Sequence, residues 1–256
     1  PVNFIDPTGM TFYFTASGKF AYEVDDGKDD RMMAMTTKKK EVEACVKNGE
    51  VFLPSSDDVL KRMDGGYDKT DATGNEHGFL GTNKDGTEKL SNDYEGVEKE
   101  VDLTSAKQEL GISDSEITVD VHTHPQGEGV TGKFGLPEPS DPDKKSIGNR
   151  IGFVLGYKAE PIDNNIGSSS SIGKKPEYKL VRYIGIYNSK KNVSLPYNSY
   201  KSAVDNVNKC STISSSFVDI PLIPTPPLCC VLYVSFVKDI ANAWLGSNLL
   251  CLYSPR

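Results

Sequence analysis

Two of the three histidines in this 256-residue chain stand as His-x-His, at His122 and His124, and a proline follows them directly. The stretch "EITVDVHTH" (116–124) alternates apolar and polar residues, which predicts a β-strand. A strand places alternate side chains on one face with Cα atoms roughly 6.5 Å apart, so both imidazoles can converge on one cation. The pattern indicates metal binding; an exposed His-x-His pair that binds nothing is the alternative.

A zinc ion bound by two histidines needs a further protein ligand and a position for water. "PSDPD" supplies two candidates, Asp141 and Asp143. Ser140 is predicted to cap a helix with proline in its first turn, where the helix dipole favours the charge of Asp143. The Ser140 hydroxyl would then lie beside the site, able to bind water or a developing oxyanion.

A hydrolytic site also needs a general base. Glu76 begins "EHGFLGT", which predicts a short apolar strand, and is the candidate; a solvated acid at a strand start is the alternative. The neighbouring His77 is expected to be a surface residue at a strand edge rather than a ligand.

Taken together, these motifs resemble the JAMM motif of the JAB/MPN-type metallopeptidases, over residues 67–188. The matching residues, in the order of that motif, are Glu76, His122, His124, Ser140 and Asp143. The resemblance implies a Zn²⁺ ion held by His122, His124 and Asp143, with Glu76 and Ser140 as catalytic residues. The loop from 125 to 140 is longer than the family usually has, which keeps Asp141 open as the third ligand.

The first ten residues, "PVNFIDPTGM", resemble the closing motif of RHS-repeat cores, secreted shells that carry toxin domains at their C-terminal ends. A plain turn at Asp-Pro-Thr-Gly is the alternative. The resemblance implies the C-terminal part of a polymorphic toxin, secreted and delivered into a target cell. A protein or peptide substrate there, a cognate immunity protein and the upstream RHS shell would be its partners, and Asp6 would belong to the shell.

The pattern of strands and helices expected around these residues predicts a mixed α/β (α+β) fold, with a central sheet and flanking helices. Two strands are predicted within 11–24, a strand and a short helix within 49–63, a helix over 104–110 and strands over 151–157 and 178–188. A further strand is expected over 98–103, and loops over 25–40, 64–75 and 163–175.

Four regions follow from this pattern: the end of an RHS core (1–10), lead-in strands and a helix (11–66), a JAB-like core (67–194) and a C-terminal tail (195–256). Within the tail, the stretch 211–256 is apolar, interrupted by proline and poor in charged residues, and its role stays open.

Composition excludes some classes of function. A net charge of −7 and a pI near 5.1 argue against a nucleic-acid partner, which requires a basic surface. No stretch reaches the ~20 apolar residues of a membrane span. The five cysteines include no C-x-x-C pair, which argues against a structural zinc ribbon and against nucleotide deaminase chemistry.

The sequence therefore predicts a zinc-dependent peptidase or isopeptidase. A non-catalytic binding module with structural histidines is the first rival, and a metal-dependent hydrolase of a non-peptide substrate is the second. The position of Glu76 relative to the histidines discriminates between catalysis and binding.

Overall fold

The computed structural model describes residues 9–126, 135–162 and 178–215 of the chain. The predictions about Asp6 and the first eight residues, the loop at 163–175 and the chain after residue 215 lie outside these ranges. Helices are mixed with parallel and antiparallel strands, so the predicted α+β class is confirmed. Among the described residues, no helix is long and apolar enough to cross a membrane.

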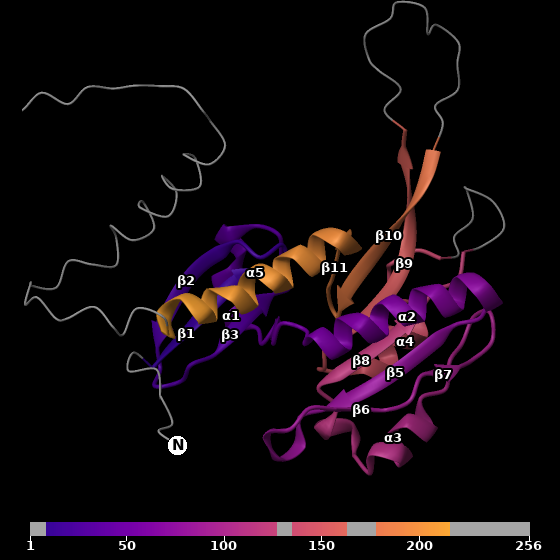
Figure 1. Cartoon of the computed structure of the whole chain (residues 1–256), viewed down its shortest axis with the longest axis horizontal. Coiled ribbons are helices and arrows are strands. Elements are labelled where there is room, and N and C mark those ends of the chain that lie inside the picture. Colours follow the sequence, from indigo (N-terminus) through magenta and orange to yellow (C-terminus); the bar gives the residue numbers. More distant parts are fainter. Residues whose placement is uncertain (1–8, 127–134, 163–177, 216–256) are drawn as a thin grey trace, which may run out of the picture. The chain divides into compact units, whose positions relative to one another are not determined.

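A seven-stranded sheet carries the candidate site (Figure 1). Its order is β11-β10-β9-β8-β5-β6, and β7 also pairs with β5. The pair β8 and β9 is parallel, whereas the other pairs are antiparallel. The strands are β5 (His77–Thr82), β6 (Lys89–Leu90), β7 (Tyr94–Glu95), β8 (Val119–Thr123), β9 (Gly152–Pro161), β10 (Tyr178–Tyr187) and β11 (Asn192–Pro196).

A four-stranded sheet with the order β2-β1-β3-β4 precedes it in the chain. Its strands are β1 (Met10–Thr15), β2 (Phe20–Asp25), β3 (Arg31–Ala34) and β4 (Val51–Phe52). The two strands expected within 11–24 are confirmed, but the loop expected over 25–40 is wrong, since β3 lies there and pairs with β1. Met33, Ala34 and Met35 have no exposed surface, so burial of a short apolar run outweighs its charged surroundings.

Helix α2 (Asp57–Thr73) is longer than the predicted short helix and replaces most of the loop expected over 64–75. Ser56 caps its start and Gly74 ends it in the left-handed conformation. Two glycines in a helix interior cost roughly 0.5–1 kcal/mol each relative to alanine. Complete burial of Tyr67, one residue after Gly66, offsets that cost.

One face of the seven-stranded sheet packs into the main core. Figure 1 shows α2 running alongside β5. The buried side chains of α2 belong to the same core cluster as Phe79 of β5 and Val121 of β8. Helix α5 (Tyr197–Ser215) adds Tyr200 and Val204, and the four-stranded sheet adds Phe14.

The chain on both sides of the predicted boundaries at 66 and 194 therefore shares one core. The described residues up to 214 belong to one compact unit.

The opposite face of the sheet is covered by α3 (Thr104–Leu110) and α4 (Asp141–Ile147). Leu80 packs with Ala106 of α3, and Val154 packs with Ile147 of α4. As predicted, α3 ends at Gly111. The strand expected over 98–103 is wrong: an isolated bridge between Val97 and Glu100 is the pairing found there. The remaining helices are α1 (Val42–Lys47), η1 (Lys39–Glu41), η2 (Lys84–Gly86) and η3 (Asp114–Glu116).

Two glycines on this second face let the segment from Gly135 to Pro139 lie directly on the sheet. A Cβ atom at Gly185 would come within 1.7 Å of the Pro137 carbonyl oxygen, and one at Gly156 within 2.6 Å of the Gly135 oxygen. The Tyr157 N–H donates to that same Gly135 carbonyl at 2.5 Å. The segment leads into Ser140 and α4, so its seating on the sheet sets where the helix begins.

We expect Gly185→Ala to lower the free energy of unfolding by about 1–3 kcal/mol, because the added methyl group displaces the Pro137 backbone. Gly65→Ala is the matched control: nothing lies within 4 Å of its Cβ, and alanine in a helix interior should stabilise by roughly 0.5–1 kcal/mol. Urea unfolding measures both changes. Equal stability of Gly185→Ala and the wild-type protein would contradict the tight seating.

Candidate metal centre

Strand β8 places His122, and His124 directly after its end, on the face opposite the main core, as the alternation predicts. Val121 enters the core, whereas His122 pairs with Gly78 of β5 and with Val154 of β9 on the other side. Thr123, between the histidines, is buried. Its hydroxyl accepts a hydrogen bond from the His77 N–H at 2.8 Å and lies 2.6 Å from the Thr70 hydroxyl of α2. These bonds fix the register of the strand that carries both imidazoles.

His124 is oriented by a backbone acceptor. Its Nδ1 lies 2.8 Å from the carbonyl oxygen of Leu136, in the segment seated on the sheet. A carbonyl oxygen can only accept, so Nδ1 carries the hydrogen, and in the neutral ring Nε2 keeps a lone pair for a metal.

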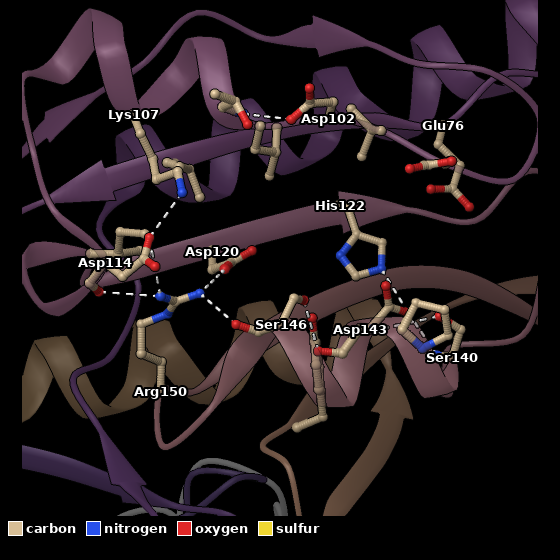
Figure 2. Close-up of a pocket in the computed structure, with 18 of the residues that line it drawn as sticks. Glu76, Asp102, Lys107, Asp114, Asp120, His122, Ser140, Asp143, Ser146 and Arg150 are labelled. Atoms are coloured by element: carbon tan, nitrogen blue, oxygen red, sulfur yellow. Dashed lines mark hydrogen bonds and ion pairs between the residues drawn. The ribbon is translucent and has the colours of Figure 1, made fainter.

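Helix α4 brings Asp143 to the histidines. Ser140 is the N-cap, as predicted: its hydroxyl accepts from the Asp143 N–H at 3.3 Å, and its N–H donates to Asp143 Oδ2 at 2.6 Å. This reciprocal capping holds the carboxylate at the start of the helix. Asp143 Oδ2 lies 3.4 Å from His122 Nε2 and 3.7 Å from His124 Nε2 (Figure 2).

The three side chains suit a tetrahedral cation. One ligand atom from each of His122, His124 and Asp143 lies within 4.8 Å of the others. Bonds of about 2.0–2.1 Å in a tetrahedral zinc site put neighbouring ligand atoms ~3.3 Å apart, close to the two nitrogen–oxygen distances. His122 Nε2 is buried and makes no hydrogen bond, so a cation would satisfy an atom that is otherwise unpartnered. Asp141 is exposed and outside this group, so the geometry favours Asp143.

The charges of the site depend on one another. Burial by itself would raise the pKa of the Asp143 carboxyl, but the neighbouring imidazoles of His122 and His124 and the hydrogen bond from the Ser140 N–H hold that pKa well below its usual value. Burial would lower the pKa of His122, yet Asp143 raises it above its ordinary value. The site is therefore a set of neighbouring opposite charges that a metal ion can join in place of protons.

Glu76 lies beside the histidines rather than in solvent. Its side chain is buried, and it lines a cavity together with His122, His124 and Ser140. Burial raises the pKa of its carboxyl, while the neighbouring imidazoles of His122 and His124 oppose that change. A carboxyl group whose pKa is raised is a stronger base than an ordinary carboxylate, which suits it to accept a proton.

The cavity occupies about 610 Å³ and extends from the candidate ligands between α3 and α4 (Figure 2). Its far end is charged, with Lys107 donating to Asp114 at 3.0 Å. Apolar side chains such as Leu80 and Ile117 complete the wall.

Arg150 is a residue that the sequence analysis missed. Its guanidinium lies 3.3 Å from Asp120 Oδ2 on β8 and donates to the carbonyls of Ser146 in α4 and Asp114 in η3 (Figure 2). It thus ties the helix that carries Asp143 to the strand that carries His122 and His124. The alternation places Asp120 on the same face of β8 as the histidines. An acid on that face needs a cation nearby, and this was the available signal for a basic partner such as Arg150.

His77 is neither a ligand nor the surface residue that was expected. It is 3% exposed, with Nδ1 3.1 Å from Asp93 and Nε2 3.2 Å from the Thr73 hydroxyl. The burial follows from its place in β5, which lies between β8 and the short strands β6 and β7.

Comparisons of this chain with protein-family models, with curated proteins and with solved structures give no match. The JAMM and RHS resemblances therefore rest on the residues quoted above.

We expect the wild-type protein to bind one Zn²⁺ ion and Asp143→Asn to bind it about a hundredfold more weakly or worse, because even outer-shell substitutions cost 10–100-fold. Asp141→Asn is the matched control, two residues away and outside the ligand group, and should bind zinc like the wild type. Competition titration with a zinc chelator measures both affinities. Loss of zinc in Asp141→Asn, with retention in Asp143→Asn, would reverse the assignment.

Proposed function

We propose that this protein is a zinc-dependent peptidase or isopeptidase. The observation that carries the proposal is the approach of Glu76, from a distant part of the chain, to the His122, His124 and Asp143 group, around a cavity that Ser140 also lines. A binding module would need the metal ligands alone. The buried carboxyl group and the hydroxyl at the same cavity support catalysis.

His122, His124 and Asp143 would hold the zinc ion, leaving a coordination position open. Zinc acts as a Lewis acid, polarising a carbonyl group and promoting ionisation of water. The other steps belong to the side chains of the chain itself.

Glu76 would accept a proton from the attacking water and pass it to the leaving amine. Its buried position favours both steps, because burial raises the pKa of the carboxyl group and so makes it a better proton acceptor. Ser140 is exposed at the N-terminus of α4. Its hydroxyl hydrogen can donate to an oxyanion while its oxygen caps the helix. The new C–O bond comes from water, the amide C–N bond breaks, and a carboxylate and an amine result.

The proposal includes the toxin context on separate grounds. The motif in residues 1–10 supports delivery into a target cell as the C-terminal part of a secreted RHS protein, with a cognate immunity protein.

Replacement of Glu76 by glutamine should leave zinc binding unchanged and lower the rate of peptide cleavage at least ~100-fold, because general acid–base catalysis contributes about 10²–10⁴-fold. Zinc content by elemental analysis and cleavage of a peptide library by mass spectrometry give the two readouts. Cleavage at the wild-type rate would remove Glu76 from this role.

Ser140→Gly tests the oxyanion role apart from the capping role. Glycine is well tolerated at an N-cap, costing a few tenths of a kcal/mol, so the helix and the zinc affinity should persist. Loss of the hydroxyl donor should lower kcat about 10²-fold or more with little change in KM. A fall in zinc affinity with an unchanged kcat at saturating zinc would instead assign Ser140 a structural role.

A further inference from the structure

Two cavities meet at the candidate metal centre. The second occupies about 550 Å³, beside the first cavity of about 610 Å³. Each by itself falls in the range of roughly 300–1,000 Å³ that is usual for ligand pockets. Glu76, Lys99, His124 and Ser140 line both cavities. The groups assigned to proton transfer and to the oxyanion therefore lie at the junction, with room for a bound chain on either side.

The walls of the two cavities differ in chemistry. Pro125, Leu136 and Pro139 make most of the exposed wall of the second cavity apolar, and the Leu136 side chain is 38% exposed. Charged side chains also line this cavity, at Glu98, Lys99 and Glu138. The first cavity ends instead among charged groups such as Lys107 and Asp114. An apolar side chain is favoured in the second cavity because it would cover apolar surface that now faces water.

The second cavity is built on a fixed backbone. The segment bearing Leu136 and Pro139 is the one seated on Gly156 and Gly185, and the Leu136 carbonyl holds the His124 ring. The apolar wall and the metal ligand are thus held by the same stretch of chain. A residue bound against Leu136 would be placed at a set distance from the reacting groups.

We propose that the substrate lies across both cavities and is cut at an internal peptide bond, with an apolar side chain in the second cavity next to that bond. This inference rests on the proposed function and specifies its substrate class. The peptide crosses the junction, water supplies the oxygen of the new carboxylate, and the C–N bond breaks with a proton passing to the new amine. Neither end of the substrate chain needs to be free.

The test uses the zinc-loaded protein and peptides acetylated at the N-terminus and amidated at the C-terminus, with leucine or aspartate placed at successive positions. We expect internal cleavage of the blocked peptides, with kcat/KM at least about tenfold higher for leucine than for aspartate at one position beside the cut bond. Mass spectrometry of the products locates the bond.

Leu136→Lys should reverse this preference in favour of aspartate, because it puts a positive charge on the wall and leaves the backbone acceptor of His124 in place. Leu53→Lys is the matched control: Leu53 is 52% exposed and lines neither cavity. It should keep the preference for leucine.

Binding is measured separately, as fluorescence anisotropy of labelled, blocked peptides with the Glu76→Gln protein. Cleavage restricted to peptides with a free end would overturn the inference and leave the proposed function standing. Binding that prefers leucine and is reversed by Leu136→Lys, without any cleavage by the wild-type protein, would support the two-sided cleft and overturn the peptidase. Absence of both binding and cleavage would overturn both.

Discussion

A segment of polypeptide can lie directly against a β-sheet only where the sheet presents no side chains. At Gly156 and Gly185 this protein meets that condition, and the carbonyls of Gly135 and Pro137 occupy the space that side chains would fill. The orientation of His124, through the Leu136 carbonyl, and the start of α4 at Ser140 both follow from this contact. The candidate metal centre is therefore assembled on a close contact between backbones.

The site also depends on favourable charges and hydrogen bonds around its buried carboxyl groups. Glu76, Asp120 and Asp143 are three carboxyl groups partly or wholly removed from water on one face of the sheet. Such groups are tolerated when cations or hydrogen-bond donors surround them. Arg150 forms an ion pair with Asp120, and the imidazoles and the Ser140 N–H surround Asp143. The side chains thus already provide the charge pattern that a divalent ion would complete.

One face of the sheet packs into the main core, and the other face carries the candidate site. On one face, α2 and α5 bury large side chains such as Tyr67 and Tyr200, and on the other α3 and α4 leave a cavity that reaches the histidines. Because β8 contributes to both faces at alternate residues, the core that fixes Val121 also fixes His122. A rigid strand with a packed back face is a good support for a site that requires set distances.

By itself the sequence determined the local features of this protein. The alternation around the histidines, the cap at Ser140 and the helix end at Gly111 involve residues within a few positions of one another, so composition and spacing were sufficient to predict them.

The tertiary structure alone decided the features that depend on distant partners. Helix α2 continues through Gly65 and Gly66 because its buried face packs on the sheet, and β3 forms because β1 lies beside it. Arg150 acquires its place from three separate elements, and Asp143 is favoured over Asp141 because α4 turns the one side chain toward the histidines and leaves the other exposed. Such choices are fixed by burial and by contacts between residues far apart in the chain, which spacing along a single sequence does not encode.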